Sequence, residues 1–149
     1  MEIRRAQLAE AESLANLFLR SFRSALPTVK LAHTDDETRQ WYRDHLLPET
    51  DTWVFIREGK IVGFISLSAS TVEQLYVDSR ETGKGVGARL IETAKQIRPK
   101  GLSLATFAVN IPARRFYEKH GFKHVRSTDG SNNEEHEPDV YYEWKPTKE

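Results

Sequence analysis

The stretch from Val72 to Ala94 reads VEQLYVDSRETGKGVGARLIETA, and its pattern changes twice along its length. Residues 72–77 place bulky apolar side chains among polar ones, which is typical of a strand. Glycines follow at a spacing of two, at Gly83, Gly85 and Gly87. Apolar residues then recur at helical spacing, at Val86, Leu90, Ala94 and Ile97. The stretch therefore predicts a strand, a glycine-rich turn and an amphipathic helix.

A glycine-rich turn at the start of a helix can bind a phosphate group. The first amides of a helix have no internal partner and lie at the positive end of its dipole. Glycine lets this backbone approach an anion closely, because no Cβ intervenes. Lys84 in the turn, with Arg80 and Arg89 beside it, adds positive charge. We expect an anion site here, although a plain strand-to-helix turn that uses glycine for its geometry would show the same triplet.

The turn differs from the two commonest nucleotide-binding motifs. Residues 83–87 (GKGVG) lack the Gly-Lys-Ser/Thr of a P-loop, and the third glycine comes one residue earlier than in G-x-G-x-x-G. The turn resembles instead the acyl-CoA pyrophosphate loop of the GNAT N-acetyltransferase superfamily, Q/R-x-x-G-x-G/A after a strand of the type L-Y-V-D-P. Thr82 stands where that family usually has Gln or Arg, and Ser79 where Pro is common. These departures affect one loop contact and leave the backbone amides in place.

A second motif lies downstream. Residues 110–122 read NIPARRFYEKHGF and resemble the family segment N-x-x-A-x-x-F-Y-E-K-x-G-F at every defined position. Asn110 suits a helix N-cap, and Gly121 suits the left-handed turn that ends a helix. With both motifs in the right order and at the right separation, the chain is identified as a member of the GNAT superfamily from about Trp53 to its end and, more loosely, over its first helices.

The composition excludes several other classes of protein. Lysine plus arginine equals aspartate plus glutamate at 22 each, so no net charge draws the chain to nucleic acid or to a membrane. The absence of cysteine excludes disulfides, thiolate metal sites and a cysteine nucleophile, and we expect no metal. The first residues lack the apolar core of a signal peptide. We expect one domain over residues 1–149, a soluble cytoplasmic protein, and a monomer or homodimer.

The whole chain predicts an α/β (α+β) fold. Strands are expected at residues 2–5, 52–57, 61–67, 72–77, 102–107, 122–127 and 140–144. Helices are expected at residues 8–23, 35–47, 86–97 and 110–120. A capping box at Thr34 and Glu37 begins the second helix, Pro48 ends it, and Glu58-Gly59 forms a hairpin. The resemblance implies the GNAT fold: a single mixed, mostly antiparallel sheet of about seven strands, helices on both faces, and a V-shaped split between the two central strands.

The resemblance also implies acetyl-CoA as cosubstrate. Its pantetheine arm would lie in the split along residues 75–77, and the backbone amide of Tyr76 or Val77 would polarise the thioester carbonyl. Asn110 would bond the pantetheine or position Tyr117, and Arg114 with Arg115 and Lys119 could meet the 3′-phosphate, although a solvated helix face explains these cations equally. The expected cofactor-binding residues are Leu75, Tyr76, Val77, Thr82, Gly83, Lys84, Gly85, Val86, Gly87, Ala88, Asn110, Arg114 and Tyr117.

The resemblance implies two catalytic residues. Tyr117 matches the family's acid, which protonates the departing thiolate; from the sequence alone, a buried tyrosine bonded to backbone is the alternative. Glu73 lies near where many relatives place a glutamate that acts as base, directly or through water; an exposed strand carboxylate accounts for it equally. His33 and His45 are weaker candidates for the base, since one lies in a loop and helical packing explains the other.

The segment at residues 129–139, DGSNNEEHEPD, carries five carboxylates and no lysine or arginine. A solvated turn is the usual explanation of such a run. The alternative is a surface that attracts a cationic acceptor, such as a polyamine, an aminoglycoside-like compound or a basic peptide. In that case Glu134, Glu135 and Glu137 would bind the substrate.

Together these features predict an acetyl-CoA-dependent N-acetyltransferase that moves an acetyl group to a primary amine of a small molecule or peptide, by direct attack in a ternary complex. One rival is a GNAT-fold acyl-CoA-binding domain with weak or no catalysis, which the presence of both Tyr117 and Glu73 argues against. The other is an enzyme acting on nucleotide phosphates through the same turn, which the second motif argues against.

Overall fold

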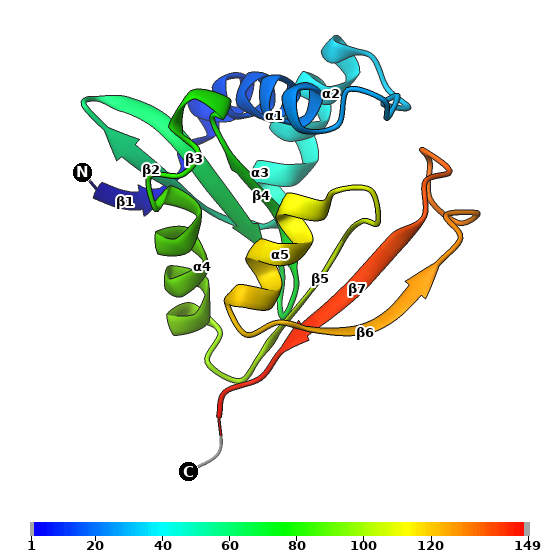
Figure 1. Cartoon of the computed structure of the whole chain (residues 1–149). Coiled ribbons are helices and arrows are strands. Elements are labelled where there is room, and N and C mark those ends of the chain that lie inside the picture. The colour runs from blue at the N-terminus through cyan, green and yellow to red at the C-terminus, as the bar shows by residue number, and fades with distance from the viewer. Residues whose placement is uncertain (1, 148–149) are drawn as a thin grey trace.

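A computed structural model describes residues 2–147 of the chain (Figure 1). The strands are β1 (Glu2–Arg5), β2 (Asp51–Arg57), β3 (Lys60–Leu67), β4 (Val72–Val77), β5 (Leu102–Phe107), β6 (Lys123–Thr128) and β7 (Asp139–Trp144). The longer helices are α1 (Ala11–Ala25), α2 (Asp35–Trp41), α4 (Val86–Ile97) and α5 (Ile111–Lys119). Short helical segments are η1 (Leu8–Glu10), η2 (Tyr42–Leu46), α3 (Leu47–Glu49) and η3 (Ser79–Glu81). The predicted α/β class and order of elements are confirmed, while residues 1, 148 and 149 of the predicted domain lie outside the described residues.

The strands form two antiparallel sheets. One has the order β1-β2-β3-β4 and the other the order β5-β7-β6. Among the described residues, one parallel bridge joins the two sheets, between Thr71 and Ser103, where the Ser103 N–H donates to the Ser70 carbonyl at 2.8 Å. Beyond this junction β4 and β5 part (Figure 1). The structure thus has two sheets, of four and three strands, instead of the predicted single sheet of about seven, and the division lies between β4 and β5.

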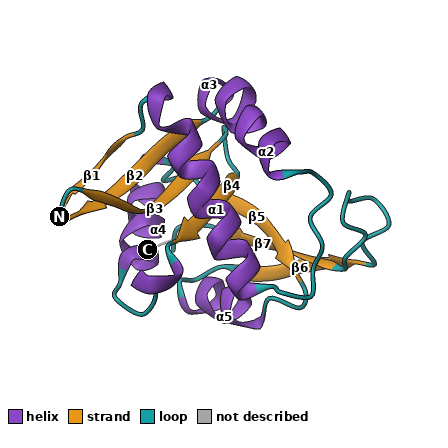
Figure 2. Cartoon of the chain, turned by 90° about the horizontal axis from the view of Figure 1, so that it is seen from above, coloured by secondary structure: helices purple, strands orange, loops and turns teal. Residues whose placement is uncertain are grey.

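Helices pack on both faces of the first sheet, as predicted (Figure 2). Alternate residues of a strand point to opposite faces, and the strand pair β2–β3 shows this directly. Val54 and Phe64 pack with buried residues of α1 and η2, whereas Phe55 and Ile65 pack with α4 and the second sheet. The α4 side of this core is continuous with Leu104 of β5, so apolar burial joins the two sheets where backbone pairing does not.

The second predicted helix begins as expected but ends later. The Thr34 hydroxyl accepts from the Glu37 N–H at 3.1 Å, and the Glu37 carboxylate accepts from the Thr34 N–H at 2.9 Å, which confirms the capping box. The helix then widens into the π turn η2 and ends at Glu49 rather than at Pro48. Pro48 is tolerated because it lies in the first turn of α3, where no N–H donor is required.

The hairpin between β2 and β3 also matches its prediction. Glu58 and Gly59 have positive φ angles of 52° and 74°, as a two-residue type I′ turn requires. Within residues 2–147, no helix has the length and apolar content that a membrane crossing needs.

Candidate active site

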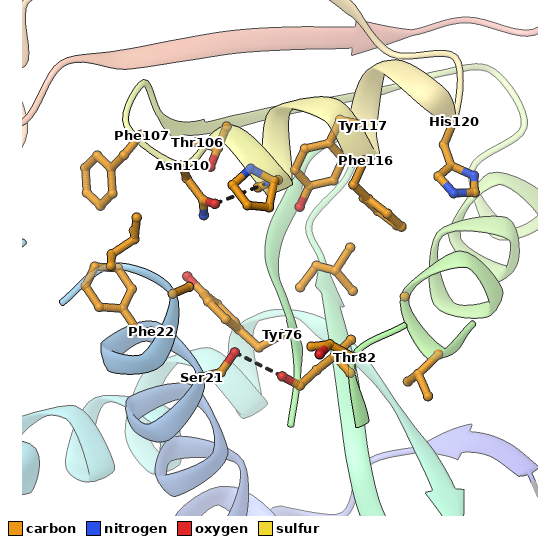
Figure 3. A pocket seen from close by; sticks show the side chains of 18 of the residues that line it. Ser21, Phe22, Tyr76, Thr82, Thr106, Phe107, Asn110, Phe116, Tyr117 and His120 are labelled. Carbon is orange, nitrogen blue, oxygen red and sulfur yellow. Dashed lines mark hydrogen bonds between the residues drawn. The ribbon is translucent and has the colours of Figure 1, made fainter. Parts of the chain in front are cut away.

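A cavity of about 820 Å³ lies where β4 and β5 part, and α1, α4 and α5 also contribute to its wall (Figure 3). It brings together eleven of the predicted cofactor-binding residues, which come from β4, from the turn before α4 and the first turn of α4, and from α5 with its N-cap. These are Leu75, Tyr76, Val77, Thr82, Gly83, Gly85, Val86, Gly87, Ala88, Asn110 and Tyr117. The two sequence motifs therefore face one space.

The turn before α4 presents backbone amides to this cavity. Gly85 is the N-cap of α4 with φ 83°, in the left-handed region that favours glycine. The first bond of the helix joins the Arg89 N–H to the Gly85 carbonyl at 3.1 Å. The amides of residues 86–88 precede that bond and are the ones that a helix leaves without an internal partner. They form a cradle with the chemistry that a pyrophosphate group requires.

Close packing explains why this cradle has glycine at position 87. A Cβ at Gly87 would lie 3.3 Å from the ring of Phe116 on α5 and 3.7 Å from a methyl group of Val77 on β4. Both lie in the wall of the cavity. Gly87 therefore lets α4, α5 and β4 converge at the point where the amides are exposed.

Two predicted cations are engaged elsewhere. The Lys84 ammonium pairs with Glu81 at 2.8 Å, and this contact is the main cause that lowers the pKa of Glu81. Arg114 donates to the Tyr142 hydroxyl at 3.2 Å and to the Ala108 carbonyl at 3.3 Å, so it ties α5 to the second sheet. Neither side chain lines the cavity, because each has an acceptor that the sequence does not reveal. Lys119, at the end of α5, lines it instead.

The end of β4 points backbone groups into the cavity. The Asp78 N–H donates to the Val62 carbonyl of β3 at 2.8 Å, so Asp78 faces β3. Backbone groups alternate in direction along an antiparallel strand, so Val77, the next residue back, faces away from β3. The Val77 carbonyl accordingly accepts from the Ser21 hydroxyl of α1 at 3.0 Å (Figure 3). Of the two amides predicted to polarise a carbonyl, that of Val77 faces the cavity and that of Tyr76 faces β3.

Tyr117 lies in the wall formed by α5. It is 8% exposed, its ring packs against Phe116 and Phe122, and its hydroxyl points into the cavity (Figure 3). Its place in the wall favours a phenol that is open to a ligand over the alternative of a phenol bonded to backbone. Burial raises the pKa of Tyr117, which keeps the phenol protonated and able to donate.

Glu73 is not among the residues that line the cavity, which favours the alternative of an exposed strand carboxylate over a base. The pairing of β3 with β4 shifts register here, with Ser66 opposite Gln74 and Leu67 opposite Val72, so Glu73 is the bulged residue. Its carboxylate is exposed and accepts from the Ser68 hydroxyl at 2.9 Å. The bulge turns this side chain away from the cavity. A bulge could not be predicted here, because the periodic pattern of the sequence does not reveal one.

The end of the cavity away from the amide cradle is lined by residues that were not predicted as site residues from the sequence. Ser21 and Phe22 come from α1, Phe107 from β5, and Asp139 from the start of β7. The available signal was weak: Ser21 is a polar residue beside the apolar face of a predicted helix. We call this region the acceptor end, since it lies away from the amide cradle.

The acidic segment reaches the acceptor end only in part. Glu135 lines the cavity, together with Asn133 and the buried Asp139. Glu134 lies against His33 of the loop before α2, and neither Glu134 nor Glu137 lines this cavity. His45 pairs with Glu49 at 2.9 Å, outside the cavity. Within residues 2–147, no group of three His, Cys, Asp or Glu side chains is placed to hold a metal ion.

Comparison with known proteins agrees with the motifs. The family model described as the acetyltransferase (GNAT) family matches residues 11–122. The chain is 30% identical over 121 residues to peptidyl-lysine N-acetyltransferase YiaC of Escherichia coli strain K12, covering 80% of this chain and 82% of that protein.

Solved structures show the same fold. The solution structure of apo-form YjaB from Escherichia coli superposes with a TM-score of 0.80 at 28% identity and covers 96% of each chain. The crystal structure of the PaiA N-acetyltransferase from Thermoplasma acidophilum in complex with coenzyme A gives a TM-score of 0.77 at 22% identity, covering 97% of this chain and 98% of that one.

Proposed function

This chain belongs to the GNAT acetyltransferase family, and from that membership we propose that it transfers an acetyl group from acetyl-CoA directly to a primary amine within a ternary complex. It is an acetyl-CoA-dependent acyltransferase. The observation that carries the proposed mechanism is that the amide cradle of α4 and the protonated hydroxyl of Tyr117 face the same cavity. A site that only held the cofactor would need the cradle but not the proton donor.

The cosubstrate would occupy the cradle and the free edge of β4. Residues 86–88 offer amides to its pyrophosphate, with the helix dipole adding to the attraction. The backbone of Leu75 and Val77 faces away from β3 and can pair with the amide groups of the pantetheine arm, as a strand would. The thioester would then lie near the end of β4, between Val77 and Tyr117, which both line the cavity.

The reaction then needs charge stabilisation and proton transfer. The acceptor nitrogen bonds to the thioester carbon, and the Val77 N–H donates to the carbonyl oxygen as negative charge develops on it. The carbon–sulfur bond breaks, and Tyr117 donates its proton to the departing sulfur. A base takes one proton from the acceptor ammonium before the attack, because only the neutral amine has a lone pair, and the nitrogen loses its second proton after it bonds to carbon, which returns Tyr117 to its protonated form.

For that base we propose an acidic group at the acceptor end rather than Glu73. Glu135 and Asp139 both line the cavity, whereas the Glu73 carboxylate is turned away by the bulge in β4. Glu135 is the better candidate, because both oxygens of Asp139 already accept hydrogen bonds, from the Thr128 hydroxyl and the Asn133 amide; Glu135 can act directly or through one water. The charge of both carboxylates also favours an acceptor that arrives as an ammonium ion. The acceptor that we propose is the side chain of a lysine in a peptide or protein, which is the substrate that the name of YiaC gives for that relative.

Replacement of Tyr117 by phenylalanine tests the mechanism. Tyr117→Phe should lower kcat by roughly 10²-fold, the loss typical of a general acid, and leave the acetyl-CoA dissociation constant nearly unchanged. The matched control is Tyr141→Phe, which removes a phenol on β7 that does not line the cavity. CoA release with a panel of lysine peptides and simple amines measures kcat, and calorimetry measures binding.

The outcomes separate the alternatives. Binding of acetyl-CoA without CoA release for any acceptor would favour an acyl-CoA-binding protein with weak or no catalysis. An unchanged kcat in Tyr117→Phe, with chemistry shown to be rate-limiting by single-turnover measurement, would reduce Tyr117 to a packing residue.

A further inference from the structure

A second cavity, of about 490 Å³, adjoins the acceptor end of the first. It lies between the helical segment formed by α2 and η2 on one side and the acidic segment, residues 129–139, on the other. No part of the mechanism above uses it. Both cavities include Glu135 in their walls, so the second is a neighbour of the active site rather than a remote surface feature.

The wall of this second cavity combines aromatic rings with carboxylates. Phe18, Trp41 and Tyr42 contribute the rings; Tyr42 is buried in the core, whereas Trp41 is 44% exposed although it is among the largest apolar side chains, so Trp41 is the ring that a ligand would meet. The Tyr42 hydroxyl donates to Gln74 at 3.1 Å, which fixes that ring in place. Aromatic faces beside carboxylates attract organic cations through the ring quadrupole as well as through charge.

Four carboxylates line the second cavity, those of Glu37, Asp44, Glu134 and Glu135, and within residues 2–147 no lysine or arginine does. His33 and His45 are also in the wall, where His33 pairs with Glu134 and Glu37 and His45 with Glu49, so Asp44 and Glu135 are the carboxylates without a histidine partner. Arg43 reaches Asp44 at 3.4 Å but is not part of the wall. Carboxylates alone would make an ordinary solvated surface; here they surround a cavity with an aromatic wall, so a cation that enters is partly removed from water and interacts more strongly.

Two contacts tie the walls together beside the active site. The Ala32 N–H donates to the Glu135 carboxylate at 3.3 Å, and His33 pairs with Glu134. These contacts hold the acidic segment against the loop before α2. They place the carboxylate of Glu135 at the boundary between the two cavities, where a chain passing from one to the other would meet it.

We infer that the second cavity binds a second cationic group of the acceptor. The acceptor class is a primary amine joined by an aliphatic spacer to an ammonium or guanidinium group. A diamine has this chemistry, and so does a lysine near another basic residue in a peptide. The inference rests on the proposed function for the place of the first amine, while the binding of the second cation is a separate property of this cavity.

Binding of quaternary ammonium ions tests the inference without any acetyl transfer. The probes are alkanes with a trimethylammonium group at both ends, with spacers of several lengths, and alkanes of the same lengths with one such group. With CoA bound, we expect the best doubly charged probe to bind about tenfold more tightly than its singly charged partner. Equal affinity at every spacer length, measured by calorimetry, would overturn the inference.

Variants locate the second cation. Asp44→Asn and Trp41→Ala alter only the second cavity, and each should reduce the preference for the doubly charged probe about threefold to fivefold. The matched control is Asp36→Asn, an exposed carboxylate on α2 outside the wall. An unchanged preference for the doubly charged probe in both Asp44→Asn and Trp41→Ala would overturn the inference. Both substitutions are at exposed positions, so both variants should fold.

Turnover distinguishes the source of the second cation. Diamines are compared with alkylamines of equal length, and lysine peptides with an arginine neighbour are compared with alanine-flanked ones. A lower KM for the doubly charged member of either pair, lost in Asp44→Asn, supports the inference and identifies the source. No acetyl transfer to any amine would contradict the proposed function, while the binding ratio would still decide the role of the second cavity.

Discussion

The hydroxyl of Ser21 on α1 reaches the Val77 carbonyl at 3.0 Å and so connects the first helix to the end of β4. Val77 is the residue whose amide faces the cavity, and a hydrogen bond to its carbonyl restrains the orientation of that strand end. Ser21 is therefore a positioning residue in our mechanism: it touches the backbone that would polarise the thioester rather than the reacting atoms.

Ser21→Ala should lower kcat by up to about tenfold, because a typical hydrogen bond contributes on the order of 1 kcal/mol. Ser21→Thr, which keeps the hydroxyl, should recover most of the loss. Ser24→Ala, one turn later on the exposed side of α1, is the matched control. Steady-state kinetics with saturating acetyl-CoA gives the comparison, and equal rates for Ser21→Ala and Ser24→Ala would remove Ser21 from the mechanism.

Site residues were predictable where the backbone supplies the function. Val86, Gly87 and Ala88 line the cavity as expected, because helix amides point outward whatever the side chains are. Lys84 and Arg114 do not, because Glu81 and Tyr142 engage them and such partners depend on tertiary packing. The same limit applies to Ser21: only the fold shows that it meets β4.

At the scale of an element, α4 combines two requirements at its N-terminus. Its apolar residues fix it against the first sheet, and Gly85 turns the chain so that its first amides face the cavity. A Cβ at Gly85 would meet no atom within 4 Å, so space does not require glycine there. The φ of 83° requires glycine, because other residues adopt the left-handed region only at a cost in free energy.

Gly85→Ala should therefore lower the free energy of unfolding by about 1 kcal/mol and weaken CoA binding, since relief of the strain moves the cradle amides. Gly85→Asn should lose less of both quantities, because asparagine tolerates the left-handed region better than alanine. Urea denaturation and calorimetry with CoA give the two quantities. If the two variants behave alike, the backbone angle at Gly85 does not govern the cradle.

The elements themselves were predictable to within a few residues wherever one period dominated. β1, β4, β5 and α4 match their predicted bounds, because alternation and helical spacing are strong in these segments. The end of the second helix was missed, since Pro48 stops a helix interior but is accepted in a first turn. The bulge at Glu73 was missed because it adds one residue without altering composition.

At the scale of the whole molecule, the cavity is bounded by both sheets, while a single bridge joins them among residues 2–147. A ligand that contacts β4, α4 and α5 at once adds connections between parts that are otherwise held by the apolar core. Ligand binding should therefore have a measurable effect on the stability of the entire chain.

CoA at 100 times its dissociation constant should raise the unfolding temperature by roughly 5–10 °C, from about 2.7 kcal/mol of binding free energy at that concentration. ATP at the same concentration should raise it much less, because it lacks the pantetheine arm that pairs with β4. Thermal denaturation monitored by circular dichroism measures both shifts. An equal shift with ATP would support a protein that binds nucleotide phosphates and contradict the assigned cosubstrate.

The edge of β4 that faces away from β3 carries one further consequence. A strand with an unpaired edge is ordinarily a template on which another protein molecule can add its own strand and begin to aggregate. Here that edge lies inside a cavity, with α1 on one side and α5 on the other, so the strand of a neighbouring molecule cannot lie along it (Figure 3). A thin chain with amide groups still can. Recessing the edge thus disfavours the addition of another molecule's strand to β4 while keeping this edge open to a small-molecule ligand.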